Sequence, residues 1–138
     1  MRSLLERSGL DGRVVVESAG TAGYHVGALP DGRARAAAQA RGLALSSRAR
    51  QFLPEDWDRV DYVLAMDQQN LDDLAKIAPT AKARAKARLL RAFDPSSPPG
   101  AAVPDPYHGG PEGFEQVLDL CEAACEGLLA HLRREHQL

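Results

Sequence analysis

Two short apolar runs, each followed by a loop and a helical stretch, constrain the fold of this chain most strongly. The run at 14–16 is Val-Val-Val, and the run at 60–66 is Val-Asp-Tyr-Val-Leu-Ala-Met. Continuous β-branched runs are typical of strands that are buried on both faces of a parallel sheet. Because parallel strands need crossover connections, the sequence predicts an α/β layered fold with right-handed crossovers.

Capping residues and apolar periodicity mark the predicted helices. The alanine-rich stretch 30–41 has Asp31 near its start and Gly42 just past its end, and Asp67 is placed to cap a helix that runs through 77. The longest predicted helix, 111–133, has apolar residues at i, i+3, i+4 and i+7 spacing on one face. We also expect a helix that ends near residue 9, a helical turn at 54–57, a third strand at 87–90 and a loop at 94–104.

The composition excludes several classes of protein. A chain of 138 residues with 44% hydrophobic and 26% charged residues fits one globular domain, 1–138. Seventeen basic and nineteen acidic residues give a net charge of −2, which argues against nucleic acid or an anionic membrane as a partner recognised by bulk charge. No apolar run approaches about 18 residues, and two cysteines are too few for a disulfide framework. We therefore expect a cytoplasmic location.

The densest chemical signal is the stretch Val-Pro-Asp-Pro-Tyr-His-Gly-Gly at 103–110. Each proline fixes its own φ and disfavours helix for the residue before it, so Asp105 lies in a stiff turn. Such a turn holds a carboxylate outside the protein body beside an aromatic ring, which is the placement that a general acid needs. An Asp-Pro turn that ends a linker is the alternative interpretation.

Three loops are expected to meet in this fold. Ligands of open parallel sheets bind beyond the carboxyl ends of the strands. The loops 18–24 and 66–70 and the segment around Asp105 all leave those ends in the predicted topology. We therefore expect a ligand site that these three loops build together.

Several motifs, in order along the chain, resemble the low-molecular-weight protein tyrosine phosphatase family. They are Glu-Ser-Ala-Gly-Thr at 17–21, Gly-Tyr-His-Val-Gly at 23–27, Ala-Arg-Gln at 49–51, the run 61–67 with Asn-Leu at 70–71, and Asp-Pro-Tyr-His-Gly-Gly at 105–110. The resemblance implies a three-layer α/β fold with a parallel sheet, of the phosphotyrosine phosphatase I type. It also implies hydrolysis of phosphomonoesters in two steps through a phosphocysteine, with no cofactor and no metal.

The resemblance implies roles for residues near the expected cleft. Asp105 would protonate the leaving phenol and then assist the water that hydrolyses the phosphocysteine. Tyr107 and His108 would line the mouth of the cleft beside the substrate ring, with Tyr24 opposite. The expected substrates are phosphotyrosine proteins or small aryl phosphates.

The resemblance gives supporting roles to residues away from the cleft mouth. Ser18 would support the phosphate-binding loop from behind, and Ser46 or Ser47 would assist it. Arg50 and Asp67 match recurrent family positions, for which we expect structural roles.

One part of the family pattern is missing from this sequence. The family begins with a strand, then a Cys-x5-Arg-Ser loop that supplies the nucleophile and the phosphate-binding arginine, then a helix. Gly127 stands six residues after Cys121, and His131 stands six residues after Cys125, so neither cysteine begins this motif. Both cysteines lie on the apolar face of the last predicted helix, where a thiol is usually buried and inert.

Two explanations of this departure stay open. Either the true start lies upstream of Met1, which the retained acid loop favours, or the short chain is the real product. The absent strand would be central, between 14–18 and 60–66, and its loss leaves two rows of backbone groups unpaired. We expect the 138-residue chain alone to be inactive. We also expect it to be destabilised, unless the flanking strands pair directly or the gap pairs with another copy.

Other functions fit some of the same residues. A non-catalytic phosphoprotein-binding module would use Tyr24, Tyr107 and His108 as an aromatic cleft without an anion cradle. An arsenate reductase on the same fold would need further redox cysteines, and those at 121 and 125 lie in the wrong region. The basic residues between 76 and 91 are interpreted first as a solvated face and second as a docking patch for acidic phosphoprotein tails.

Overall fold

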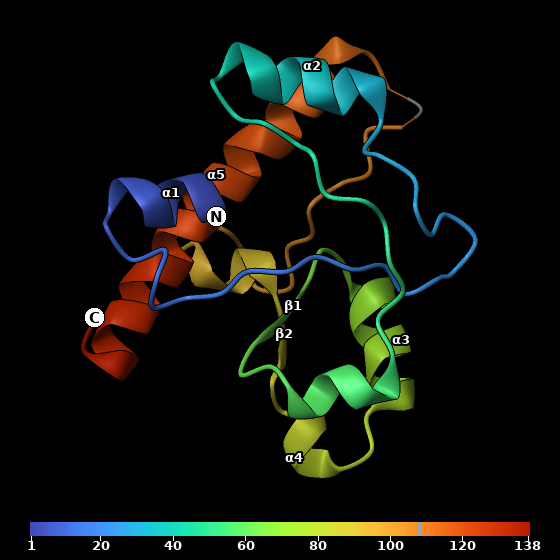
Figure 1. The fold of residues 1–138 in the computed structure, drawn as a ribbon, viewed down its shortest axis with the longest axis vertical. Coiled ribbons are helices and arrows are strands. Elements are labelled where there is room, and N and C mark those ends of the chain that lie inside the picture. The colour runs from blue at the N-terminus through green and yellow to red at the C-terminus, as the bar shows by residue number, and fades with distance from the viewer. Residues whose placement is uncertain (108) are drawn as a thin grey trace.

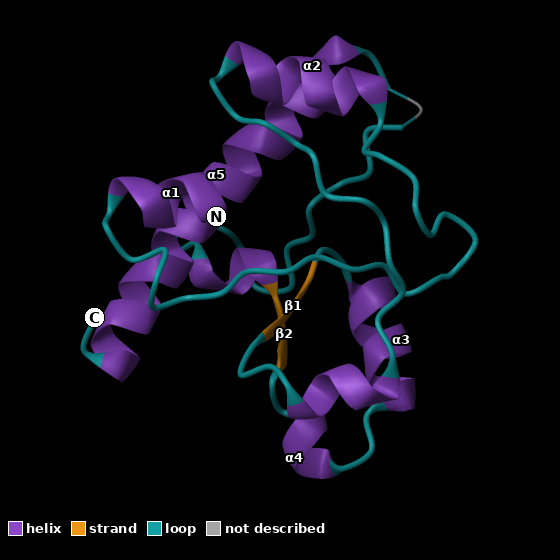
Figure 2. Cartoon of the chain, in the orientation of Figure 1, coloured by secondary structure: helices purple, strands orange, loops and turns teal. Residues whose placement is uncertain are grey.

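The structure is a computed structural model that describes residues 1–107 and 109–138. Helices lie on both sides of a short parallel sheet, and α5 runs along one side of the molecule (Figures 1 and 2). In chain order, the elements are α1 (Arg2–Arg7), α2 (Gly32–Ala40), η1 (Pro54–Asp58), β1 (Val63–Ala65), α3 (Gln68–Ile77), α4 (Ala81–Arg84), β2 (Ala87–Leu89), η2 (Leu90–Phe93) and α5 (Pro111–His136).

The sheet is formed by β1 and β2, which pair in parallel. Val63 and Ala65 of β1 pack into one core with Trp57, on the side of α3 and α4, whereas Leu64 packs toward α5 on the other face. This alternation follows from the two-residue period of a strand. The expected order of layers, helix then sheet then helix, is therefore present around a parallel sheet.

Local sequence signals determine where the helices begin and end. The Asp31 carboxylate accepts the backbone N–H of Arg33 at the start of α2, and Gly42 takes a φ of +77° just past its end. Asp67 caps α3 by accepting the N–H of Asn70 at 2.7 Å. The predictions of α2, α3 and α5 are confirmed, and α4, whose cap is Thr80, is an element that the pattern did not predict.

The predicted strand at 14–16 was wrong. Val15 is 86% exposed, and within the described residues the stretch 15–19 takes part in no ladder. A strand forms only where it pairs with another strand, and in the described chain β1 pairs with β2 rather than with this stretch. The loop that follows the stretch forms only an isolated bridge between Gly20 and Gln51. Arg2 instead donates from Nε and Nη2 to the carbonyl oxygen of Val16, at 3.0 and 2.6 Å. Direct pairing of the flanking strands, one of the expected ways to close the sheet, is therefore not observed.

The helix α1 is anchored on α5. Leu5 is 1% exposed and packs with Leu10 and with Leu129 of α5. Such a contact between apolar faces fixes a short helix that would be unstable alone. Among the helices that the structure describes, none has the length and apolar character needed to cross a membrane.

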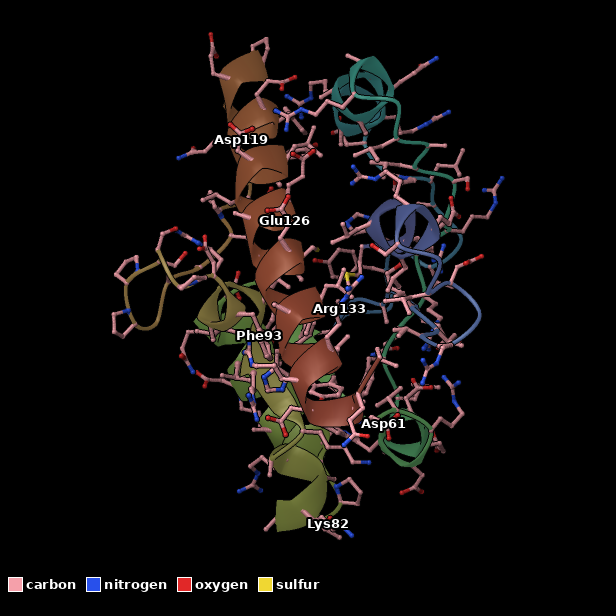
Figure 3. All side chains as sticks on the ribbon, turned by 90° about the vertical axis from the view of Figure 1, so that its left-hand side faces the viewer. Asp61, Lys82, Phe93, Asp119, Glu126 and Arg133 are labelled. Carbon is pink, nitrogen blue, oxygen red and sulfur yellow. The ribbon has the colours of Figure 1, made fainter. Side chains whose placement is uncertain are left out.

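The helix α5 passes so close to η2 that only glycine fits at position 127. A Cβ atom there would lie 1.8 Å from the carbonyl oxygen of Phe93. Figure 3 shows Phe93 close beside α5. Because the obstructing atom belongs to the backbone, one of the two elements would have to move to admit a side chain.

Gly127→Ala is therefore expected to lower the free energy of unfolding by about 1–3 kcal/mol, although alanine normally favours a helix interior. Urea unfolding followed by circular dichroism measures this change. Gly32→Ala in α2 is the matched control, because nothing lies within 4 Å of a Cβ atom at that position. That control should be neutral or stabilising by up to about 1 kcal/mol, and equal effects of the two substitutions would contradict the close approach.

Candidate active site

The acid loop (residues 103–107) is anchored at the carboxyl end of β1. The N–H of Val103 donates to the carbonyl oxygen of Met66, the residue that follows β1, at 2.7 Å. Val103 is buried and Asp105 is exposed. The loop thus fixes its base in the core and presents the carboxylate at the edge of the sheet where the topology predicts a ligand site.

The Asp105 side chain is held by its own loop. Its Oδ1 atom accepts the backbone N–H of Tyr107 at 3.0 Å, which closes a local turn typical of aspartate. No other hydrogen bond to this carboxylate occurs among the residues that the structure describes. The carboxylate therefore has a fixed direction and retains an oxygen that can exchange a proton with a ligand.

Arg33 of α2 clamps the acid loop from the side. Its Nη2 atom donates to the carbonyl oxygen of Tyr107 at 2.9 Å and to Asp31 at 3.1 Å. The guanidinium carbon also lies 5.4 Å from the centre of the Tyr107 ring and 4.8 Å from that of Phe114 in α5. The hydrogen bond from Arg33 holds the pKa of Asp31 below its usual range. Arg33 thus connects the acid loop to α2 and to α5 at once.

A groove of about 820 Å³ lies beside the acid loop. Its volume is in the range of pockets that bind small molecules, about 300–1,000 Å³. Apolar side chains of α5 and of the start of the chain form much of its wall, and the exposed residue Asp105 is part of its lining. Lining residues include Asp105, Tyr107, Met1, Leu4, Phe114 and Val117.

The two cysteines, Cys121 and Cys125, also line this groove. Both are half-buried rather than fully buried as expected. Burial raises the pKa of the Cys121 thiol. A raised pKa disfavours the thiolate, which is the nucleophilic form. Cys121 packs against the core cluster that includes Leu128 and Leu132 of α5.

The other predicted site residues lie on separate segments. Tyr24 is 82% exposed, and its ring centre lies 4.4 Å from that of His25 in an edge-to-face contact. Tyr24 is not among the residues that line the groove beside Asp105. Ser47 accepts a hydrogen bond from Nη1 of Arg2 at 3.1 Å, and Ser18 is exposed. His108 lies outside the described residues. The structure thus brings Asp105 and Tyr107 together on one loop, whereas Tyr24 and Ser18 belong to a separate segment.

A charge network holds the loop that carries Ser18. Asp56 is buried, and its carboxylate forms ion pairs with Arg50 at 3.0 Å and Arg59 at 2.7 Å. The same carboxylate accepts a hydrogen bond from the N–H of Leu53 at 2.8 Å. Both arginines reach the Glu17 carboxylate, at 3.4 and 3.2 Å. Arg50 thus makes the structural contacts expected of it. The backbone N–H of Leu53, followed by the two guanidinium groups, holds the pKa of Asp56 far below its usual range.

Asp56→Ala is expected to cost about 1–3 kcal/mol of unfolding free energy at pH 7, because a helix cap and two charged hydrogen bonds are lost. A carboxyl whose pKa is lowered by folding stabilises the protein above the pKa of the unfolded chain, near 3.9, and this contribution declines as the pH falls below it. Urea unfolding at pH 7 and pH 3 should therefore show a smaller difference between the variant and the original protein at pH 3.

Asp58→Ala is the matched control for this experiment, because Asp58 is an exposed carboxylate of the same η1 turn. Its effect should stay within about 0.5 kcal/mol at either pH. A difference for Asp56→Ala that does not shrink in acid would mean that the Asp56 charge does not stabilise the fold.

Comparisons with known proteins agree along the whole chain. A family-wide sequence profile described as "Low molecular weight phosphotyrosine protein phosphatase" matches residues 1–138. The low molecular weight protein-tyrosine-phosphatase of Streptomyces coelicolor is 44% identical over 135 residues, which cover 97% of this chain and 82% of that protein. The human low molecular weight phosphotyrosine protein phosphatase is 37% identical over 115 residues, 83% of this chain and 72% of that protein.

Solved structures give the same result. A protein tyrosine phosphatase from Entamoeba histolytica superposes with a TM-score of 0.90 at 32% identity, over 99% of this chain and 86% of that one. YfkJ from Bacillus subtilis superposes with a TM-score of 0.89 at 32% identity, over 98% of this chain and 83% of that one.

Proposed function

Because the chain belongs to the low molecular weight phosphotyrosine protein phosphatase family, we propose that, together with an upstream nucleophile loop, it hydrolyses phosphomonoesters with Asp105 as the general acid. The observation that carries this proposal is the position of the acid loop. An exposed aspartate is held in a fixed turn at the carboxyl end of β1 and at the rim of a groove. A general acid needs this combination of access and rigidity.

The proposed reaction has two steps. A cysteine thiolate forms a bond to phosphorus while the bond from phosphorus to the phenol oxygen breaks, and Asp105 gives its proton to that oxygen. Water then attacks phosphorus, the bond to sulfur breaks, and Asp105 recovers a proton from the water. The thiolate and the acid are both restored at the end of the cycle.

The nucleophile of this reaction is proposed to come from outside the 138 residues. In the sequence, no cysteine is followed six positions later by arginine. We propose that an upstream segment supplies a Cys-x5-Arg-Ser loop, that the chain is an N-terminally truncated single domain, and that it is inactive without that loop. Ser18 and Ser47 are proposed to support this loop, and the bonds from Arg2 to Val16 and Ser47 already connect their two segments.

The proposed substrates are phosphotyrosine proteins or small aryl phosphates in the cytoplasm. Tyr107 is 58% exposed beside Asp105, and Tyr24 is 82% exposed on the loop after Ser18. Together with His108, these rings are proposed to contact the aromatic ring of the substrate. If the chain functions without an upstream loop, the same rings favour the alternative, a non-catalytic phosphoprotein-binding module.

A further proposal is self-association of the short chain. It is supported by the exposed stretch around Val15 and by the edge of β1 that pairs with no other strand in the described chain. Sedimentation at rising concentration is expected to show a dimer of the 138-residue chain. Addition of the upstream strand should abolish that dimer by pairing with the same edge. A short chain that stays monomeric at every concentration would contradict this proposal.

In a protein extended to include a Cys-x5-Arg-Ser loop, Asp105→Asn is expected to lower kcat for phosphotyrosine by about 10²–10⁴-fold. The loss should be smaller for aryl phosphates with a more acidic phenol, since those leaving groups need less protonation. Steady-state kinetics with a series of aryl phosphates measures both effects.

Two further variants calibrate that experiment. Arg33→Ala leaves the acid in place but removes the clamp on its loop, and a smaller loss of about 10-fold is expected. Asp58→Asn, an exposed carboxylate outside the groove, should leave kcat unchanged. If Asp105→Asn retains the original rate on every substrate, another group is the acid.

A further inference from the structure

Basic residues are concentrated in one stretch of this slightly acidic chain. The stretch 74–93 contains six of the 17 basic residues and none of the 19 acidic residues. All the carboxylates therefore lie in the rest of the chain, with 11 basic residues. This uneven distribution gives the molecule one cationic region although its net charge is −2.

The fold gathers three of these cations around one hollow, the basic pocket. Lys82 of α4, Lys86 before β2 and Arg88 of β2 line a volume of about 310 Å³ together with Asp61, Tyr62 and Ala85. Figure 3 shows Lys82 and Asp61 at the end of the molecule opposite Asp119. The pocket thus lies where β1 begins, whereas the acid loop is anchored where β1 ends.

Lys82 and Arg88 of the basic pocket are exposed to a ligand, whereas Lys86 is half-buried and already hydrogen-bonded. In the described part of the chain, Lys82, Lys86 and Arg88 have no carboxylate within ion-pair distance. By contrast, Arg41 and Arg50 pair with carboxylates elsewhere on the surface. Asp61 is the one acidic residue of the pocket, so the lining keeps an excess of two positive charges.

The pocket is also held in shape before any ligand arrives. Lys86 donates from Nζ to the carbonyl oxygen of Trp57 at 2.7 Å, and the Arg88 guanidinium lies 5.5 Å from the centre of the Phe93 ring. Thr80 caps α4 by accepting the N–H of Ala83 at 3.0 Å, and Ala83 is buried. Preorganised charges lose less entropy on binding than free side chains do.

We propose that the basic pocket is a docking site for acidic segments of protein substrates. A run of glutamate or aspartate side chains matches its charge, and lysine and arginine form charge-assisted hydrogen bonds with carboxylates. The small volume favours a few side chains over a duplex or a bilayer, and the carboxylates elsewhere on the molecule repel an extended polyanion.

The distance between the two sites suits a single peptide. Five residue steps separate Asp61 in the basic pocket from Met66, which holds the acid loop. At about 3.3 Å per residue for a fully extended chain, this path is at most about 17 Å long. A peptide chain of about six to ten residues spans it. The phosphorylated residue of such a peptide would lie at Asp105, so this part of the inference rests on the proposed function.

Binding of a fluorescent hexaglutamate peptide to the 138-residue chain tests the docking site without catalysis. Lys82→Glu combined with Arg88→Glu is expected to weaken binding by about 10-fold in fluorescence anisotropy at low salt. The matched control is Arg13→Glu combined with Arg35→Glu, which makes the same change of net charge at exposed positions outside the pocket. Equal weakening by the two double variants would overturn the proposal.

Two further measurements decide the nature of the ligand. A single-stranded oligonucleotide or vesicles of phosphatidylserine should bind more weakly than the peptide, and tighter binding of either would replace the proposal with a general polyanion surface.

In the extended enzyme, the pocket variant should lower kcat/KM only for phosphopeptides with acidic flanks, and an equal loss on an aryl phosphate would overturn the inference. If the extended enzyme binds the acidic peptide but does not hydrolyse its phosphotyrosine, the proposed function is contradicted and the docking site is not.

Discussion

The packing of α5 is the constraint on which the rest of the structure depends. Leu128 and Leu132 form the core between this helix and the sheet, and Leu129 holds α1. Arg41, at the end of α2, reaches three carboxylates on the first half of α5. Because α5 begins at Pro111, four positions after the acid loop ends at Tyr107, the helix that closes the core also limits where that loop can lie.

The acid loop combines fixed anchor points with exposed side chains. The bond from Val103 to Met66 and the clamp from Arg33 fix the acid loop at two points. Asp105 and Tyr107 remain exposed between these points. A proton can be delivered to a leaving group only from a fixed position, and exposure lets the substrate reach it. The chain therefore carries the proposed acid, whereas neither of its cysteines begins a Cys-x5-Arg motif.

The sequence was most informative where structure depends on local interactions. Capping at Asp31 and Asp67 and the apolar spacing of α5 predicted three helices, and the two prolines around Asp105 predicted its stiff turn. The prediction of a strand at 14–16 was wrong because a strand forms only where it pairs with a partner, and no local sequence pattern specifies that partner. Arg33 was missed because its contact with Tyr107 joins residues 74 positions apart, and an arginine in a helix carries no signal of that contact.

The pH dependence of kcat for phosphotyrosine tests the central claim most directly, measured in a protein extended to include the Cys-x5-Arg-Ser loop. A general acid must be protonated to act, so a reaction that uses one should slow on the alkaline side of its pH profile. Asp105→Asn should remove this alkaline limb while leaving the acidic side of the profile in place. An alkaline limb that persists unchanged in Asp105→Asn would contradict the account, because the proton would then come from another group.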